Sequence, residues 1–210
     1  MKNYIESLNW RYATKKYDPA KKVSQNDLET LKEAVQLSVS SMGLQPYKVL
    51  IIENPEVRQQ LKAAGYNQDG ITESSHLFVF AYEKNVNETH VDAYMENISK
   101  VRQVEKDSLK PFENMVNGFI QNQTEEGLNA WAAKQAYIAL STLINTAALL
   151  HIDATPMEGF NAQQFDEILG LDKLGLSTAV IAAVGYRHEE DGFQHLKKVR
   201  KPENELFITI

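Results

Sequence analysis

The stretch Ser40-Ser41-Met42-Gly43-Leu44-Gln45-Pro46-Tyr47 marks the change from helix to sheet that decides the fold of this chain. Before it, Ser24 and Asp27 have the spacing of a capping box, which predicts a helix to about Leu37. After it, the apolar run 47–52 predicts a buried strand. The proline in the stretch prevents a helix from continuing across it. The stretch is therefore predicted to be a loop between two packed elements.

The residues of this loop allow two interpretations. Two hydroxyls, an amide and a glycine on a loop held between packed elements favour contact with a small molecule. A helix C-terminus closed by Gly43 explains the glycine equally well.

The rest of the chain continues to alternate between helical and strand patterns. Asparagine caps, glycine stops and apolar runs define these elements. They predict a helix from 55 to a stop at Gly65, a strand at 77–82, helices across 88–151, an ordered loop at 155–160, a helix at 161–169 stopped by Gly170, a strand at 177–184 and a strand-like tail at 205–210.

Composition indicates one ordinary globular domain. The 210 residues are 43% hydrophobic and 24% charged, which excludes a disordered or fibrous chain. No repeat, low-complexity segment or linker divides the sequence. We therefore expect a single α+β domain over residues 1–210.

Charge and cysteine content limit the possible binding partners and the cellular compartment of the protein. The formal net charge of −6 argues against binding to nucleic acid or to an anionic membrane. The absence of cysteine excludes disulfides and thiolate chemistry, and Met1-Lys2-Asn3 does not begin a signal sequence, so we expect a cytoplasmic protein. Residues 135–152 lack charge but contain several polar side chains, which indicates a helix buried in protein and not in lipid.

Two basic clusters stand out in this acidic chain. The first contains Arg11, Lys15 and Lys16, and the second spans residues 197–201. Two compact clusters suit one phosphate group better than a polymer backbone, although solvated basic turns would produce the same pattern.

Several catalytic motifs are missing. The chain has no Gly-x-Gly-x-x-Gly dinucleotide motif and no Gly-x-Ser-x-Gly nucleophile elbow. Its five histidines lack the spacing of metal ligands, so we expect no metal site. No pair of side chains suggests a catalytic nucleophile and its base.

The C-terminal tail carries an apolar pattern at a place where chains usually fray. Leu206, Phe207, Ile208 and Ile210 would need a sheet edge on which to dock. That edge belongs either to the same chain or to a partner, and the second case implies a homodimer. The apolar helix predicted at 135–152 is either a second part of that interface or a central core helix.

Four segments taken together resemble the FMN-dependent nitroreductase family, in the branch of oxygen-insensitive NAD(P)H nitroreductases. They are residues 11–18, 40–47, 156–160 and 198–200, and they follow the order and spacing of that family over nearly the whole chain. The resemblance implies a three-layer α/β/α fold with a mostly antiparallel central sheet. It also implies a homodimer whose subunits exchange their C-terminal strands, with FMN as cofactor and NADH or NADPH as electron donor.

The resemblance also implies a cofactor site, residue by residue. Arg11, Lys198 and Arg200 would bind the FMN phosphate with Tyr12 beside them, Lys15 would lie near N1 and O2 of the flavin, and Asn67 would read the polar edge of the ring. Backbone N–H groups of Glu158 and Gly159 would lie near N5 and O4, and Ser40, Ser41 and Gly43 would reach the flavin of the other chain. Ala13, Gln45, Pro156 and Met157 complete the cofactor-binding set, and Phe119 and Phe112 would line the substrate pocket within 106–126.

Three positions depart from the family pattern. Ala13 stands where a serine is frequent, Gly43 where some relatives have asparagine, and Gly70 where certain members place a second lysine near the flavin. The first two changes each remove a side-chain hydrogen bond. The third removes a cation that would affect the redox potential.

The activity implied by the resemblance is a ping-pong, two-electron reduction of nitroaromatics, quinones or related small-molecule acceptors at the expense of NAD(P)H. Such a site needs no catalytic side chain, because hydride transfer takes place at N5 of FMN. The alternatives are a flavin carrier or sensor with little turnover, or another reaction on the same scaffold, such as dihydropteridine reduction, dehalogenation or flavin fragmentation. A structural role without a ligand is a further alternative.

Overall fold

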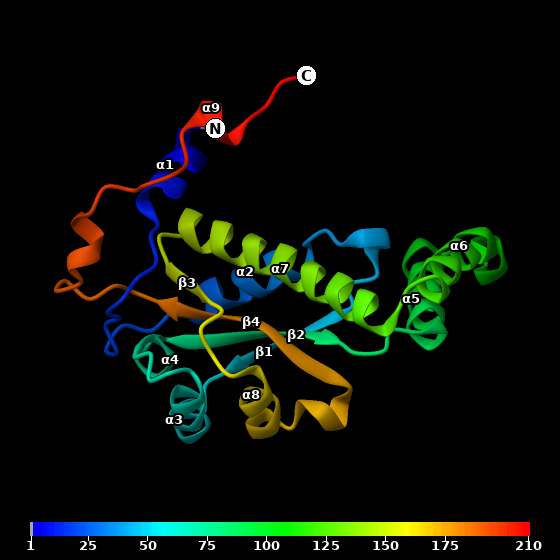
Figure 1. Cartoon of the computed structure of the whole chain (residues 1–210), viewed down its shortest axis with the longest axis horizontal. Helices are drawn as coiled ribbons and strands as arrows, with labels where there is room; N and C mark the ends of the chain where they lie inside the picture. The colour runs from blue at the N-terminus through cyan, green and yellow to red at the C-terminus, as the bar shows by residue number, and fades with distance from the viewer. Residues whose placement is uncertain (1) are drawn as a thin grey trace.

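The computed structural model describes residues 2–210, and its centre is a four-stranded antiparallel sheet (Figure 1). The strands follow the order β1-β2-β4-β3, so β1 and β3 are the edges. Their bounds are Tyr47–Ile52 for β1, His76–Glu83 for β2, Asp153–Met157 for β3 and Leu176–Gly185 for β4.

Helices account for most of the remaining chain. The α-helices are α1 (Lys2–Trp10), α2 (Gln25–Gln36), α3 (Pro55–Ala64), α4 (Gly70–Glu73), α5 (Glu88–Arg102), α6 (Lys110–Gln121), α7 (Glu125–Leu149), α8 (Ala162–Leu169) and α9 (Glu203–Leu206). Short 3₁₀ turns lie at Ser41–Gly43, Lys106–Leu109, Leu171–Leu174 and Gly192–His195.

The sheet is covered by helices on both faces, as the α+β expectation requires. Helices α2 and α7 lie on one face, and α3, α4 and α8 lie on the other (Figure 1). Alternation along β2 explains both layers, because Phe78 and Phe80 pack against the α7 side while Leu77 and Val79 pack against the α3 side. Burying a strand on both faces is what fixes its register.

Helices α5 and α6 extend beyond one end of the sheet (Figure 1). They form a separate apolar cluster with the beginning of α7, in which Val91, Met95 and Val116 are fully buried. At the opposite end of the view, α1 and the C-terminal residues lie close to one another.

The residues predicted from the sequence to cap the helices do so in the structure. Ser24 accepts a hydrogen bond from the backbone N–H of Asp27 at the start of α2. Asn54 accepts from two N–H groups at the start of α3, and Gly170, at φ +66°, ends α8 in the left-handed conformation.

Two expectations from the sequence were wrong. Residues 155–157 belong to strand β3, whereas the sequence predicted a loop across 155–160; Pro156 fits there because β3 is an edge strand. Residues 205–210 do not form a strand within their own chain: Glu205 and Leu206 lie in α9, and Phe207 to Ile210 are exposed. Docking of the tail on its own sheet is thereby excluded.

No helix among residues 2–210 combines the length and apolar character that crossing a bilayer would require.

Candidate functional site

Three cations from the two ends of the chain form one cluster. Lys198 donates through Nζ to the backbone oxygen of Leu8, at 2.7 Å, and to that of Arg11. Burial, followed by the nearby charge of Arg200, lowers the pKa of Arg11. Burial, followed by Arg11 and Arg200, lowers the pKa of Lys198. The Asp153 carboxylate partly offsets this lowering for Arg11, and the repulsion among the cations favours the binding of an anion.

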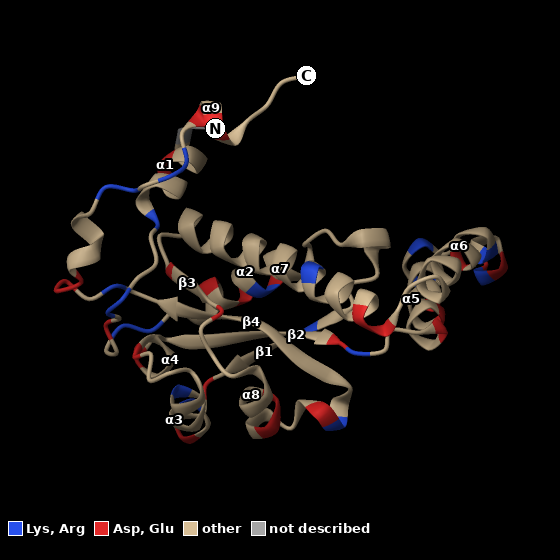
Figure 2. Cartoon of the chain, in the orientation of Figure 1, with Lys and Arg blue, Asp and Glu red and all other residues tan. Residues whose placement is uncertain are grey.

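No carboxylate in the described chain forms an ion pair with any of these three cations. Nε of Arg11 itself is buried and has no hydrogen-bond partner among residues 2–210, and the same holds for the hydroxyl oxygen of the adjacent Tyr12. A buried donor without a partner is costly, and a phosphate offers only acceptor oxygens to a guanidinium. The cluster therefore fits a phosphate group. Figure 2 shows the basic residues of this end along the segments after α1 and before α9.

The segment that carries Arg11 to Lys15 has no helix or strand of its own, so its shape depends on contacts with other elements. The buried carboxylate of Asp191 accepts from the backbone N–H groups of Lys15, at 2.7 Å, and Lys16, at 3.1 Å. Burial alone would raise the pKa of Asp191, but these N–H groups lower it. The ammonium group of Lys15 lies 5.7 Å from the ring centroid of Phe193.

Tyr17 fastens the end of the same segment to the sheet. Its hydroxyl lies 2.9 Å from Oγ1 of Thr155 and 2.9 Å from the backbone oxygen of Ala183. The ring is 1% exposed, so these contacts are shielded from water. They fix the position of the basic segment relative to β3 and β4.

The loop after β3 is held from two sides. Tyr137 of α7 donates to Oε1 of Glu158 at 2.6 Å, and Gln68 donates to the backbone oxygen of Gly159 at 2.7 Å. Burial and the Glu158 carboxylate together raise the pKa of Tyr137 to about 12. Since Asn67 precedes Gln68, the structure brings two of the predicted cofactor segments together.

A cavity of 460 Å³ lies between α7 and this loop. Leu140, Ile144 and Val180 give it an apolar wall, while Tyr137 and Glu158 contribute polar groups. Pro156 also lines it, while Met157, the next residue, is buried in the core on the other face of the sheet. A mostly apolar cavity with a few polar groups suits a flat ring system.

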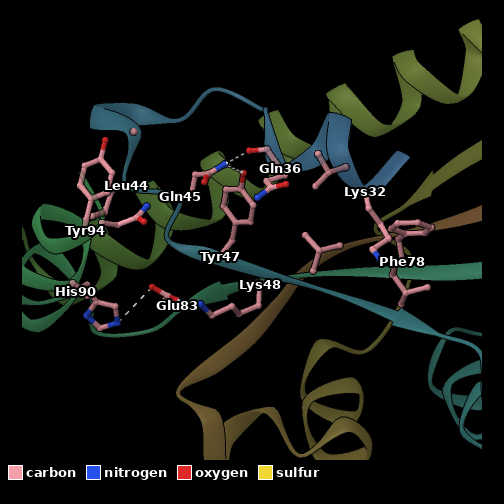
Figure 3. Close-up of a pocket in the computed structure, with 16 residues that line it drawn as sticks. Lys32, Gln36, Leu44, Gln45, Tyr47, Lys48, Phe78, Glu83, His90 and Tyr94 are labelled. Carbon is pink, nitrogen blue, oxygen red and sulfur yellow. Dashed lines mark hydrogen bonds and ion pairs between the residues drawn. The ribbon is translucent and has the colours of Figure 1, made fainter. Parts of the chain in front are cut away.

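The loop at 40–47 is shaped by hydrogen bonds within the chain. Ser40 accepts from the backbone N–H of Gln45 at 2.9 Å, and Gln135 of α7 accepts from that of Ser41 at 2.8 Å. The side-chain amide of Gln45 donates to the backbone oxygen of Gln36 at 3.0 Å, as Figure 3 shows.

Gly43 has a different role from the helix stop that the sequence allowed. Helix α2 has already ended at Gln36, and Gly43 closes a 3₁₀ turn with φ +74°. A Cβ atom built on Gly43 would lie 2.3 Å from the hydroxyl of Tyr94. Glycine is therefore favoured here by backbone conformation and by close packing.

The predicted site residues fall into two groups within one chain. The basic cluster lies at the end that holds α1 and the C-terminus, whereas the 40–47 loop lies toward α5 and α6 (Figure 1). Phe112 and Phe119 belong to the second group, where they pack against Tyr94 and Trp131 at ring-centroid distances of 6.4 and 5.3 Å. A single chain does not bring the two groups together.

Four residues of the site escaped the sequence analysis: Asp153, Arg187, Asp191 and Tyr137. Asp153 and Arg187 pair at 2.7 Å, although they lie at the ends of different strands. The only signal in the sequence is that Arg187 follows the strand predicted at 177–184, because no strand was predicted near Asp153. No group of three or more histidine, aspartate or glutamate side chains in the described residues could hold a metal ion.

Comparison with known proteins identifies the class. The antiparallel sheet between two helical layers, with a cationic cluster beside it, defines an α+β protein suited to a phosphorylated ligand. A sequence model described as the nitroreductase family matches residues 8–186, and this chain belongs to that family.

Three individual proteins illustrate the similarity. A Staphylococcus haemolyticus protein named as an NAD(P)H nitroreductase is 36% identical over 216 residues, which cover 98% of this chain and 96% of the relative. A Bacillus subtilis structure named as a nitroreductase has a TM-score of 0.89 at 21% identity, over 100% of both chains. An Exiguobacterium sibiricum nitroreductase solved with FMN has a TM-score of 0.86 at 18% identity, covering 99% of this chain and 97% of that one. The two structures establish the fold, and the first relative supports the family.

Proposed function

We propose that this protein is an FMN-dependent NAD(P)H oxidoreductase that passes two electrons to nitroaromatics, quinones or related acceptors in a ping-pong cycle. The observation that carries the proposal is the cluster of Arg11, Lys198 and Arg200, whose cations lack a carboxylate partner within residues 2–210 and lie beside two unpaired buried polar atoms. The names of the relatives, which include NAD(P)H nitroreductase and a complex with FMN, agree with it.

The chain's own residues would hold the cofactor by charge and by shape. Each cation of the cluster would attract the phosphate by about 4 kcal/mol at 4 Å and an effective dielectric constant near 20, before the cost of desolvation. Lys15 would stabilise negative charge on the ring, and the loop from Pro156 to Gly159 would present backbone N–H groups to it. Bound FMN supplies hydride acceptance and two-electron transfer, and the protein orients the reactants.

We further propose that the working form is a homodimer. Strand β1 is an edge, and a cavity of 620 Å³ lined by Tyr47, Val49 and Ile51 lies along it (Figure 3). A second cavity, of 540 Å³, is lined by Lys48 and Leu50 of the same strand. An extended apolar strand could pair with β1 and place alternate side chains in the two cavities. The exposed tail of a second chain, residues 206–210, fits this requirement.

A dimer would also explain the separation of the two groups of site residues. The 40–47 loop and the two phenylalanines of one chain would complete the site formed by the basic cluster of the other. Ser40, Ser41 and Gly43 would then contribute through the loop backbone, and Phe112 or Phe119 would face the acceptor.

The test is an absorbance spectrum of the purified protein, recorded before and after anaerobic addition of NADH or NADPH and then of menadione or a nitrofuran. We expect a yellow protein that is bleached by one donor and recoloured by the acceptor. A yellow protein that no donor bleaches would favour a carrier or sensor. A colourless protein that ignores added FMN would contradict the proposal.

Arg200→Ala tests the phosphate assignment within this experiment. The variant should lose FMN on dialysis while its far-UV circular dichroism stays unchanged. Lys173→Ala removes one exposed positive charge from the turn Leu171–Leu174 and serves as the control, because this turn lies between α8 and the start of β4, across the molecule from the segments after α1 and before α9 (Figure 1). Equal flavin content in both variants would contradict the assignment.

A further inference from the structure

Arg187 belongs to none of the four family segments, and it lies at the centre of a set of contacts that reaches one of them, residues 11–18. Its guanidinium carbon is 4.1 Å from the ring centroid of Trp10 and 4.5 Å from that of Tyr12. Its Nη2 and Nε atoms donate to Oδ1 of Asp153 at 2.7 and 3.1 Å, and its backbone N–H donates to Oδ2 at 2.9 Å. Asp153 also accepts from the hydroxyl of Thr14 at 3.1 Å. One side chain therefore joins the ends of β3 and β4 to residues 10–14.

The charge of Arg187 is neutralised by the Asp153 carboxylate in these contacts. Asp153, which is 2% exposed, forms a close ion pair with it, so Arg187 adds little net charge to the cationic cluster nearby. A planar guanidinium matches both the flat rings and the carboxylate, which an ammonium group cannot do. The contribution of Arg187 to this region is geometric.

Arg187 holds a segment whose position depends on such side-chain contacts. Arg11 and Tyr12 have no regular secondary structure to hold them, and each has an unpaired buried polar atom. Trp10, Tyr12 and Thr14 contact the pair formed by Arg187 and Asp153 directly, so the backbone that carries Arg11 is held on both sides. Loss of the planar group would free this segment while leaving the strand ladder between β3 and β4 in place.

We propose that Arg187 is a positioning residue for the cofactor phosphate: with Asp153, it fixes residues 10–14 so that Arg11 faces the phosphate, without contacting the phosphate itself. This inference rests on the proposed function, because it presumes that the cationic cluster binds a phosphorylated flavin. In this inference Arg187 and Asp153 do not contact the ligand, but they determine how tightly the site binds the phosphate.

The test compares FMN with riboflavin, which differs from it only by the phosphate. Dissociation constants for both are measured by flavin fluorescence quenching on the flavin-free protein, in the wild type and in Arg187→Lys. We expect the preference of the wild type for FMN to fall by about tenfold in the variant, with the riboflavin constant nearly unchanged. General destabilisation would weaken both ligands together and leave the preference intact.

Salt dependence separates positioning from direct contact. Arg200→Ala removes a phosphate-binding charge and should flatten the dependence of FMN affinity on salt concentration. Arg187→Lys keeps its charge and should leave that dependence unchanged while the affinity falls. Trp10→Leu removes one ring without altering charge, and it decides the question if Arg187→Lys does not fold; it too should lower the preference for FMN.

The outcomes distinguish this inference from the function on which it rests. If the wild type prefers FMN and both variants keep that preference, the positioning role is wrong and the proposed function stands. If the wild type binds riboflavin as tightly as FMN, the assignment of the phosphate cluster fails and the positioning role fails with it.

Discussion

The hydroxyl of Tyr137 lies 2.6 Å from Oε1 of Glu158, so a single hydrogen bond joins the longest helix, α7, to the loop that follows β3. The same loop is held on its other side by Gln68. Gln68, Glu158 and Gly159 all lie outside the helices and strands. Both contacts therefore determine the conformation of a loop that the sheet by itself leaves free.

Tyr137→Phe tests the importance of this contact for the loop. Without the hydroxyl, the Glu158 side chain is released, and we expect the dissociation constant of FMN to rise about two- to fivefold, the equivalent of a single modest hydrogen bond. Fluorescence titration of the flavin-free protein measures this. Tyr66→Phe is the matched control, since Tyr66 is 67% exposed. Equal constants in the two variants would show that the contact is dispensable.

Alkaline pH should destabilise the fold through three tyrosines, of which only Tyr17 is fully buried. Burial raises the pKa of Tyr17 and of Tyr12 above the ordinary value of 10, and burial with Glu158 raises that of Tyr137 to about 12. Because the neutral form is favoured in the folded state, this stability is fully present below pH 10. It is lost as the pH rises from 10 toward the folded pKa, at about 1.4 kcal/mol per pH unit for a fully buried tyrosine such as Tyr17.

Chemical denaturation between pH 8 and pH 11.5 checks this expectation. Tyr17→Phe should cost about 1 to 2 kcal/mol at pH 8, where it removes buried hydrogen bonds, and should also reduce the loss of stability above pH 10. An unchanged alkaline slope in Tyr17→Phe would assign the effect to other groups.

Gly43→Ala should destabilise the protein by about 1 to 2 kcal/mol, because alanine is strained at φ +74° and its Cβ would meet the Tyr94 hydroxyl. Tyr94→Phe removes that oxygen, although the ring carbon that bears it is still 3.2 Å from the added Cβ. The double variant should therefore recover part of the loss. A double-mutant cycle of unfolding free energies measures the coupling, and strict additivity would mean that the backbone angle alone requires glycine.

Elements whose signals are local could be predicted from the sequence. Helix α2 begins after Ser24 and α8 ends at Gly170 because caps act within one turn. Strand β3 was missed because its proline is typical of a loop, and only the pairing with β4, which is distant in sequence, makes it an edge strand. The tail has a strand pattern, but it pairs with no strand among residues 2–210.

In the candidate site, too, residues with a signal in the sequence were predicted, and residues that depend on contacts between distant segments were not. Charge clustering and family resemblance together led to Arg11, Lys198 and Arg200, whose charges lie close enough in the structure to affect the pKa of Arg11 and of Lys198; their role in binding phosphate stays a prediction. Arg187 and Asp153 could not be found in this way. Their pairing depends on the register of β3 and β4, in which Asp153 lies opposite Gly185, and no sequence motif encodes that register.

Ile208→Asp tests whether the tail docks on β1 of a second chain. Ile208 is 87% exposed in the single chain, so a charge there should not affect the fold of a monomer. If the tail is buried between two chains, each chain loses about 1.5 to 3 kcal/mol of apolar burial and the dimer dissociates at micromolar concentration. Sedimentation velocity measures this over a concentration series.

Thr209→Asp is the matched control, because successive residues of a strand face opposite sides and Thr209 already presents a polar group. It introduces the same charge one position further along and should weaken the dimer less. Flavin content should follow dimer content in both variants, since each proposed site needs residues from two chains. A flavin-loaded monomer of Ile208→Asp would show that one chain is sufficient, and it would exclude the 40–47 loop of a partner from the site.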